Sequence, residues 1–428
     1  MEKFVINGGT RLLGKVKVSG AKNAAVAILP AVIVSDEPCI IENLPMVSDV
    51  AVIVDIMSSL GVRVQFIDKH TLSIDATGML CGEVPAELAR SIRAAYYFLG
   101  ALLTRYRRAS VPMPGGDDIG SRPIDQHLKV FSALGGKWNV EYGIVNITAR
   151  NELAGARVFF DIVSVGATIN AILSAVKTPG QTTLENVAKE PHIVDVANFL
   201  NSMGADIRGA GTDVIKIRGV QYLRGTTYSI VPDQIEAGTF MAAAAATQGD
   251  VLITGVIPKH LESITDKIKL SGALVEEYDE AVRVKGADTI TATNIKTMPH
   301  PGFPTDMQPP MASLLCRAGG TSIITEGIWD SRFKYVDELR RLGAKIQVDG
   351  KVAVIEGVRR LTGAPVRTPD IRAGAALMIA ALAAEGVSEI EDIYHIERGY
   401  EDVVEKLKGL GADIERVFVP DDTLGQAF

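Results

Sequence analysis

The chain has 428 residues, which is more than one hydrophobic core usually serves and enough for two domains. Apolar residues make up 47%, charged residues 22% and aromatic residues 6%, a balance that favours a globular protein and disfavours base-stacking surfaces for nucleic acid. The net charge of −7 predicts no general attraction to nucleic acid or to an anionic membrane, so an anion site would need a local group of basic residues.

The first residues, MEKFVINGG, alternate between polar and apolar types and do not form a signal peptide, while the apolar run MAAAAAT is too short to span a bilayer. Cys39, Cys81 and Cys316 include no C-x-x-C pair, which argues against disulfides and zinc. Walker, dinucleotide-binding and metalloprotease motifs are absent. We therefore expect a cytoplasmic protein without a metal or an organic cofactor.

A glycine beside small or apolar residues recurs six times at intervals of 68 to 74 residues, at Gly61, Gly135, Gly204, Gly272, Gly343 and Gly411. Each glycine follows a segment of helical period and precedes an alternating segment, so each is predicted to end a helix. Each unit also has an earlier helix and strand; in three of them the helix is plainly Ala-rich, at residues 19–34, 164–176 and 370–386. One unit thus consists of helix, strand, helix and two strands.

Six such units predict an α/β protein of two domains, each with three βαβαββ-like units. The Ala-rich helices lack a polar face, so we expect them to be parallel and buried inside sheets, as inside-out α/β barrels. The predicted domains are residues 22–231, with a mobile loop at 112–123, and residues 1–21 plus 232–428. Parallel helices present their N-termini at one end, and two such ends would form an electropositive cleft for an anionic substrate.

Five basic residues lie at the starts of these units or in turns, at Lys22, Arg122, Arg332, Arg372 and Arg398. Each alone is more typical of a solvated or salt-bridged surface charge. Together they could converge to bind a phosphate and a carboxylate.

Two aspartates are candidate acids or bases. Asp117 lies in the Gly-rich loop PGGDDIGSRP, which could close as a lid or be a plain surface turn. Asp306 lies in FPTDMQ, where an Asx turn is the alternative.

The motifs VSGAKNAA, PGG-x-x-IG-x-RP-x-D, SVGAT, HP-x-FPTDMQ, D-x-RA and IYHI-x-RGYE together resemble the UDP-N-acetylglucosamine 1-carboxyvinyltransferases, a family of enolpyruvyl transferases. The resemblance covers essentially the whole chain. It implies two inside-out α/β barrel domains and transfer of enolpyruvyl from phosphoenolpyruvate to the 3′-hydroxyl of UDP-N-acetylglucosamine. That reaction is the first committed step of peptidoglycan synthesis, and its only partners are these two small molecules.

The resemblance also implies roles for individual residues. Lys22, Arg122 and Arg398 would bind the phosphate of phosphoenolpyruvate, and Arg332 and Arg372 its carboxylate side. Asp306 would accept the proton of the sugar hydroxyl, and Asp370 would position the arginines. The residues implied to bind the nucleotide sugar are Asn23 (also beside phosphoenolpyruvate), Arg93, Arg122, Pro123, Ile124, Asp125, Gln126, Ser164, Val165, Gly166, Asp306 and Ile328.

The sequence departs from the family at two positions. Asp117 stands where most members have cysteine, and a carboxyl can donate a proton but attacks an epoxide poorly, so we expect insensitivity to the epoxide fosfomycin. Ile162 stands where a lysine is common beside the uridine, which could alter nucleotide affinity.

Three alternatives remain at this stage. A relative that uses shikimate 3-phosphate typically has an arginine soon after the lysine, and the segment AKNAAVAI has none. A catalytically silent repeat protein would be expected to lose the basic set, which this chain retains. A nucleic-acid end-processing enzyme conflicts with the acidic charge and the scarcity of aromatic residues.

Overall fold

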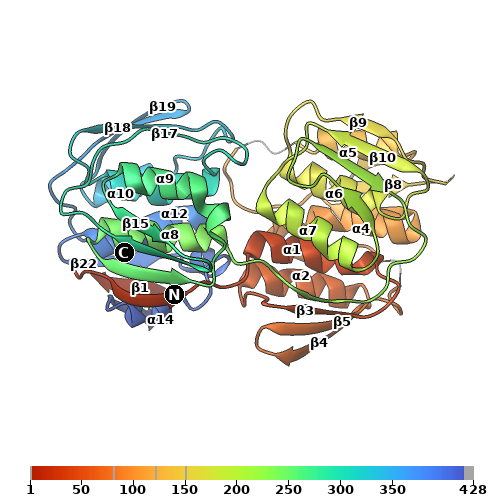
Figure 1. Ribbon diagram of the computed structural model, residues 1–428, viewed down its shortest axis with the longest axis horizontal. Coiled ribbons are helices and arrows are strands. Elements are labelled where there is room, and N and C mark those ends of the chain that lie inside the picture. The colour runs from red at the N-terminus through yellow and green to blue at the C-terminus, as the bar shows by residue number, and fades with distance from the viewer. Residues whose placement is uncertain (1, 81, 121–122, 150–151, 419–428) are drawn as a thin grey trace, which may run out of the picture. The chain divides into compact units, whose positions relative to one another are not determined.

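The computed structural model describes residues 2–80, 82–120, 123–149 and 152–418 of the chain (Figure 1). Contacts divide the chain into two compact units. Unit 1 comprises Met1–Ser19, Asp118–Ser121 and Pro232–Phe428, and unit 2 comprises Gly20–Asp117 and Arg122–Val231. This division differs from the expected domains at residues 20 and 21 and at the four loop residues that group with unit 1.

Unit 2 is built around three inner helices, whose apolar and small residues are buried against one another. These are α1 (Lys22–Ala31), α4 (Tyr97–Tyr106) and α6 (Val165–Ala175). The remaining helical elements are η1 (Val32–Val34), α2 (Ser48–Ser59), α3 (Ala86–Ser91), η2 (Arg93–Tyr96), α5 (Asp125–Ala133) and α7 (Pro191–Ser202).

Three sheets surround these helices. The first has the order β13 (Thr227–Ser229), β3 (Cys39–Glu42), β5 (Thr71–Asp75) and β4 (Arg63–Asp68). The second has β11 (Asp206–Arg208), β12 (Val214–Arg218), β10 (Gln181–Glu185) and β9 (Arg157–Phe159). The third has β6 (Arg108–Pro112), β8 (Ile144–Thr148) and β7 (Lys137–Glu141).

Unit 1 repeats this plan. Its inner helices are α8 (Gln234–Ala246), α10 (Gln308–Leu315) and α12 (Ile371–Ala383), which all contact one another. Every residue of α12 is buried, because an Ala-rich helix with no polar face is stable only inside a core. The other helical elements are η3 (Pro258–Leu261), α9 (Glu262–Leu270), η4 (Thr305–Met307), α11 (Val336–Arg341), α13 (Tyr394–Glu397) and α14 (Val403–Gly409).

The sheets of unit 1 likewise number three in the described part of the chain. One has the order β21 (Pro365–Arg367), β22 (Val387–Glu391), β1 (Glu2–Asn7) and β23 (Asp413–Phe418). The next has β15 (Leu274–Glu277), β16 (Ala281–Lys285), β14 (Asp250–Thr254) and β2 (Leu13–Lys17). The last has β17 (Ile295–Lys296), β18 (Thr321–Thr325), β20 (Val352–Glu356) and β19 (Lys345–Asp349). The predicted fold of buried helices inside sheets is confirmed.

The inner helices of each unit run in parallel, as their end contacts show. In unit 2 the Asn170 side chain, in the second turn of α6, donates to the Tyr96 carbonyl just before α4 over 3.0 Å. At the opposite ends, Arg105 near the end of α4 donates to the Ile33 carbonyl, which lies beyond α1, over 2.8 Å. Each unit therefore gathers helix N-termini at one end, where free N–H groups carry partial positive charge.

Two strands are exchanged along the chain. Strand β2 precedes α1 but pairs in parallel with β14 of unit 1. Strand β13 precedes α8 but pairs in parallel with β3 of unit 2. Each unit thus receives one strand from the segment that leads into the other unit's first helix.

All six repeat glycines have positive φ, between 82° and 103°. They follow α2, α5, α7, α9, α11 and α14 in turn. In the first case the amide of Val62 donates to the Met57 carbonyl over 3.1 Å, and equivalent bonds close the turns at Gly135, Gly204, Gly343 and Gly411. A left-handed residue is needed for this helix end, which explains why the repeat shows in the sequence as glycine.

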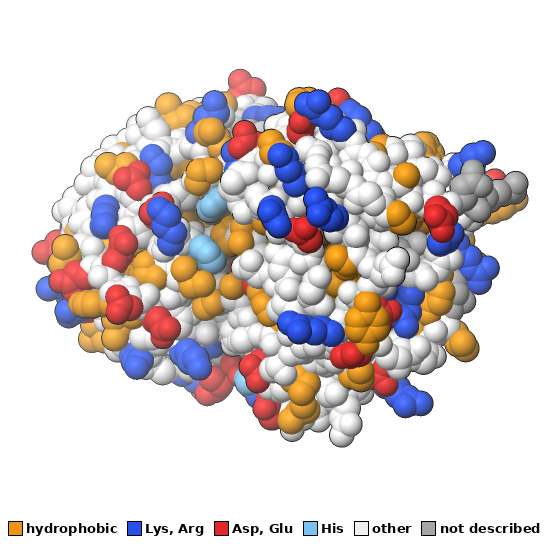
Figure 2. Space-filling view, turned by 45° about the vertical axis from the view of Figure 1, so that its right-hand side comes forward, with side chains coloured by type: hydrophobic (Ala, Val, Ile, Leu, Met, Phe, Trp, Pro, Cys, Tyr) orange, Lys and Arg blue, Asp and Glu red, His pale blue; other side chains and the backbone are white. Residues whose placement is uncertain are grey.

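On the face shown in Figure 2, basic and acidic side chains lie interspersed among uncharged ones. Among the described residues, no helix combines the length and the apolar character required to cross a bilayer.

Candidate active site

Three predicted residues of unit 1 form one ion-pair cluster. The two carboxylate oxygens of Asp306, in η4, lie 3.1 Å from Arg332 Nη2 and 3.2 Å from Arg372 Nη2. The arginine side chains are 2% and 4% exposed, whereas the aspartate side chain is 29% exposed. One further nitrogen on each arginine is buried without a hydrogen-bond partner among the described residues. Two cations against one carboxylate, with donors left over, are suited to a bound anion.

Asp370 fixes the backbone that carries Arg372. Its Oδ1 accepts hydrogen bonds from the amides of Arg372 and Ala373, at 2.9 and 3.0 Å, and so caps α12. The guanidinium lies over the Tyr400 ring, 5.3 Å from the centroid, and the Tyr400 hydroxyl is 3.0 Å from Thr239 Oγ1. Arg372 is therefore held at its backbone by the cap and at its side chain by the ring.

A buried carboxylate ties together the two segments beside this cluster. Glu326 Oε1 accepts from the Thr297 hydroxyl at 2.7 Å and from the amides of Ile328 and Trp329 at 2.8 and 3.2 Å. Its Oε2 accepts from the Thr305 hydroxyl at 3.0 Å. Glu326 thus fixes both the predicted sugar contact at Ile328 and the residue directly before the cluster's aspartate.

Part of the Gly-rich loop packs on the segment 330–334, which carries one arginine of the cluster. Asp118 forms an ion pair with Lys334. The Ser331 amide donates to the Ile119 carbonyl over 3.2 Å. Gly120 has φ +117°, and a Cβ atom there would lie only 3.2 Å from the backbone of Asp330. The loop therefore needs glycine at this close approach.

The preceding part of the loop packs on unit 2. A Cβ on Gly115 would lie 1.8 Å from the Arg90 carbonyl oxygen, and one on Gly116 would lie 3.2 Å from the Arg93 amide nitrogen. Asp117 follows directly and is half-buried. The paired glycines thus bring the Asp117 backbone close to Arg93, a predicted sugar ligand.

Lys22 and Asn23 begin α1. Among the described residues, no side chain caps this helix, and a helix N-terminus of this kind favours an anion. Lys22 Nζ lies 2.9 Å from Asp49 Oδ2, with the two side chains 12% and 4% exposed. Asp49 therefore anchors the lysine that was predicted to bind phosphate.

Ser164, Val165 and Gly166 form the N-terminus of α6. The Ser164 hydroxyl accepts from the Ala167 amide at 3.3 Å. Nearby, Gln126 in the first turn of α5 donates to Asp125 at 2.8 Å and to Asp161 at 3.1 Å. The predicted nucleotide residues of unit 2 thus lie at the starts of two helices, where amides favour phosphate oxygens.

The other predicted residues differ in burial. Arg398 follows α13 and is half-buried, Ile124 is buried and Pro123 is exposed. Arg122 lies outside the described residues. The convergence of Lys22, Arg122 and Arg398 on one phosphate therefore stays a prediction.

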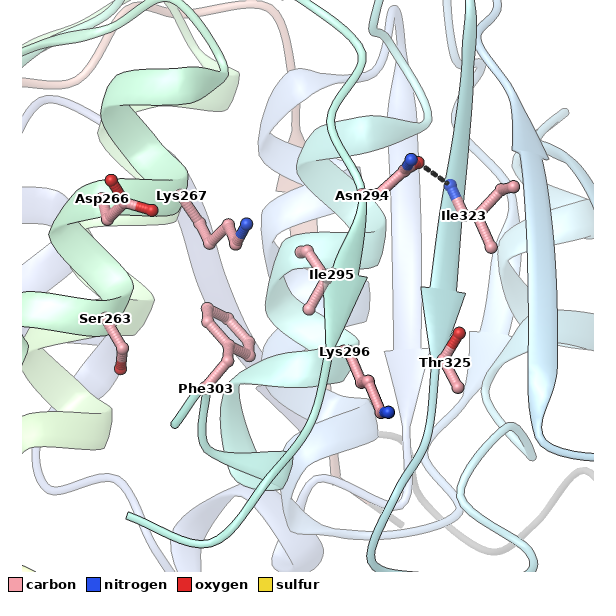
Figure 3. Close-up of a pocket in the computed structure, with 9 residues that line it drawn as sticks. All are labelled: Ser263, Asp266, Lys267, Asn294, Ile295, Lys296, Phe303, Ile323 and Thr325. Carbon is pink, nitrogen blue, oxygen red and sulfur yellow. Dashed lines mark hydrogen bonds between the residues drawn. The ribbon is translucent and has the colours of Figure 1, made fainter. Parts of the chain in front are cut away.

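Two hollows, one in each unit, lie elsewhere. One, of about 410 Å³, lies in unit 1 between α9 and the strands β17 and β18 (Figure 3). There Lys267 points from the helix toward the strand, and Asn294 accepts from the Ile323 amide. The other, of about 490 Å³, lies in unit 2 around Arg105 and Lys177. Neither hollow is lined by a predicted site residue.

Sequence reasoning missed three residues that support the site, namely Asp49, Glu326 and Tyr400. Tyr400 lies in the motif IYHI-x-RGYE, but nothing in the local sequence marks Asp49 or Glu326, because each acts on a residue distant in the chain or through a backbone amide. A fourth, His127, lies two residues after the motif RP-x-D. This closeness to the motif was the signal in the sequence that could have pointed to it.

A family model described as EPSP synthase (3-phosphoshikimate 1-carboxyvinyltransferase) matches residues 6–407, and the chain therefore belongs to this family of carboxyvinyltransferases. Within the family, it is 56% identical over 417 residues to UDP-N-acetylglucosamine 1-carboxyvinyltransferase 3 of Caldanaerobacter subterraneus subsp. tengcongensis, covering 97% of this chain and 100% of that protein. It is 54% identical over 418 residues to UDP-N-acetylglucosamine 1-carboxyvinyltransferase of Clostridium botulinum, with the same coverage.

Among solved structures, the enolpyruvyl transferase NikO from Streptomyces tendae matches with a TM-score of 0.87 and 29% identity, covering 98% of this chain and 99% of that one. EPSP synthase from Acinetobacter baumannii matches with a TM-score of 0.76 and 17% identity, over 98% of this chain and 100% of that one, which shows the shared fold.

Proposed function

We propose that this protein transfers the enolpyruvyl group of phosphoenolpyruvate to the 3′-hydroxyl of UDP-N-acetylglucosamine and releases phosphate, a step that commits the sugar to peptidoglycan. The observation that carries this proposal is the buried pair Arg332 and Arg372 around Asp306, in a chain 56% identical to a named UDP-N-acetylglucosamine 1-carboxyvinyltransferase. The cluster supplies both a base and cations for an anionic substrate.

In the proposed reaction, Asp306 takes the proton of the sugar hydroxyl while the hydroxyl oxygen forms a bond to C2 of phosphoenolpyruvate. Asp117, as a carboxylic acid, donates a proton to C3, which gives a tetrahedral intermediate. The C2–O bond to phosphate then breaks and C3 loses a proton, which leaves the enol ether and free phosphate. Lys22, Arg122 and Arg398 would hold the phosphate, with Arg332 and Arg372 on the carboxylate.

The residues of unit 2 would hold the nucleotide sugar, from Asn23, Arg93 and the segment 122–126 to Ser164–Gly166, with Asp306 and Ile328 of unit 1 at the sugar. The starts of α1 and α6 support this assignment, because among the described residues α1 has no side-chain cap and α6 is capped by one bond only, and amides at helix N-termini bind phosphate oxygens.

The proposal is tested by phosphate release from phosphoenolpyruvate with UDP-N-acetylglucosamine as acceptor. We expect Asp117→Asn to lower kcat by a factor on the order of 10² to 10⁴, since an amide donates no acid proton. Shikimate 3-phosphate is the control acceptor, because the matching family model is named for that substrate. Turnover with shikimate 3-phosphate alone would overturn the proposed substrate.

We also propose that the protein resists fosfomycin, because a carboxylate opens an epoxide far more slowly than a thiolate does. The matched variant is Asp117→Cys, which should retain turnover and gain time-dependent inactivation by fosfomycin. Covalent labelling of Asp117 in the unmodified protein, seen by mass spectrometry, would contradict this.

A further inference from the structure

His127 is buried between α5 and α6, and its environment assigns it a task that the predicted site residues leave open. The side chain lies on α5 and the residue is 4% exposed. Its ring lies 5.4 Å from the Tyr96 ring, between centroids. A Cβ on Gly166 would approach its Cε1 and Nε2 atoms to 3.0 and 3.1 Å. The glycine thus leaves room for the imidazole beside the first turn of α6.

Hydrogen bonds fix which ring nitrogen carries the proton. Asn170 Oδ1 accepts from the Gly100 amide at 2.9 Å, so the amide nitrogen of Asn170 must face the other way. That nitrogen donates to the Tyr96 carbonyl at 3.0 Å and lies 2.8 Å from His127 Nδ1. Since Nδ1 receives a proton there, it cannot carry one, and the neutral ring has its hydrogen on Nε2.

The ring stays neutral at physiological pH. Burial, helped by the positive charge of Arg93, lowers the pKa of His127 to about 3, against a smaller opposing effect of Asp125. The donor on Nε2 is therefore present at every pH at which the enzyme would work.

This donor lies toward the N-terminus of α6. Asn170, which holds Nδ1, lies one helical turn further along α6 than Gly166, which lies beside Nε2. Nε2 has no hydrogen-bond partner among the described residues. The nitrogen without a partner is thus the one nearer to the amides at the N-terminus of an 11-residue helix.

We infer that His127 is a further substrate-binding residue, whose Nε2–H donates to an oxygen of the diphosphate bound at the first turn of α6. The inference rests on the proposed function, which places the nucleotide sugar at Ser164–Gly166. A diphosphate oxygen fits, because it is a charged acceptor attracted by the same helix N-terminus. A neutral donor adds this bond without the desolvation cost of another buried cation.

Two substitutions test the two ring nitrogens of His127 separately. In His127→Asn, the side-chain oxygen keeps an acceptor near the position of Nδ1, beside Asn170. The variant has no donor at the position of Nε2. Gln supplies an amide nitrogen near the position of Nε2. We expect His127→Asn to weaken binding of UDP-N-acetylglucosamine and of UDP by about 10- to 100-fold in calorimetry, and His127→Gln to stay within about threefold of the unmodified protein.

Uridine, which has no diphosphate, should bind both variants like the unmodified protein, and KM for phosphoenolpyruvate should not change. Equal UDP affinity of His127→Asn and the unmodified protein would overturn the inference. Equal losses in both variants, accompanied by equal falls in melting temperature, would show a structural role only and would overturn it too. Failure of the unmodified protein to bind UDP-N-acetylglucosamine would instead defeat the proposed function.

Discussion

The two units have the same arrangement of inner helices but differ in the residues that lie at the N-termini of these helices. In unit 1 an aspartate lies at the start of each inner helix, and two of the three, Asp233 and Asp370, cap their helices with bonds of 2.7 to 3.1 Å. In unit 2 no aspartate holds these places: α1 begins after Ala21 without a side-chain cap, and Ser164 caps α6 through one bond of 3.3 Å.

This difference separates two ways of using the same partial positive charge. Acidic caps neutralise the helix ends of unit 1, and its positive charge comes instead from Arg332 and Arg372. The helix starts of unit 2 carry Lys22 at α1 and the neutral His127 beside α6, without an acidic cap in the described part of the chain. A repeated fold can thus place acidic caps at the helix starts of one half and leave the other half without them.

The largest expected effect comes from breaking the cluster of unit 1. Asp306→Asn removes the proposed base, and we expect kcat/KM to fall by a factor on the order of 10² to 10⁴. The amide oxygen can still accept from one arginine, but both buried cations lose their counter-charge, so the melting temperature should also fall and kcat/KM is measured well below it. The control is Asp250→Asn, which breaks the surface pair with Arg283 and should leave kcat/KM unchanged. Full activity of Asp306→Asn would contradict the role of proton acceptor that is proposed for Asp306.

A smaller effect concerns the neutral network of unit 2. The pKa of His127 is about 3 in the folded protein, below its ordinary value of 6.5, so the unfolded chain binds the proton first. His127 therefore contributes to a fall in unfolding free energy as pH drops from 6.5 toward 3. By pH 5 this amounts to about 2 kcal/mol.

Urea unfolding at pH 7, 6 and 5 measures this loss. The variant His127→Asn should lose about 2 kcal/mol less than the unmodified protein over that range. If the unfolding free energies of the two proteins fell equally between pH 7 and pH 5, His127 would not be held neutral. The contrast between the units would then weaken.

The smallest effect compares the caps directly. Asp370→Ala should destabilise by about 1 to 2 kcal/mol, because it removes two short bonds and a charge at the helix N-terminus. Ser164→Ala should cost about 0.5 to 1 kcal/mol, since it removes one longer bond. Thermal unfolding measures both, and Asp370→Asn is the control that retains a capping oxygen. An equal or larger loss for Ser164→Ala would contradict the contrast.

Much of the fold could be predicted, because the signals are local. The six glycines mark helix ends through a backbone conformation that other residues rarely adopt, and all six have positive φ. The Ala-rich segments, such as residues 370–386, predicted buried helices because they offer no polar face. The partners of the exchanged strands β2 and β13 were less accessible, because strand pairing joins residues more than 180 positions apart.

The candidate site, too, was predicted in part from local sequence. Motifs singled out Lys22, Asp306, Arg332 and Arg372 by residue type, but the pairing of both arginines with one aspartate joins residues 26 and 66 positions apart. Asp49, Glu326 and His127 were missed because their roles depend on what faces them: a lysine, two amides and an Asn170 nitrogen.

By itself, the sequence determined the repeat, the buried helices and the set of charged residues, since backbone preference and hydrophobic periodicity act over a few neighbouring residues. Only the tertiary structure decided which carboxylate each cation meets, which nitrogen of His127 carries hydrogen, and which helix ends stay open. Those outcomes depend on distances of about 3 Å between atoms from distant parts of the chain, where burial makes every unpaired polar group costly.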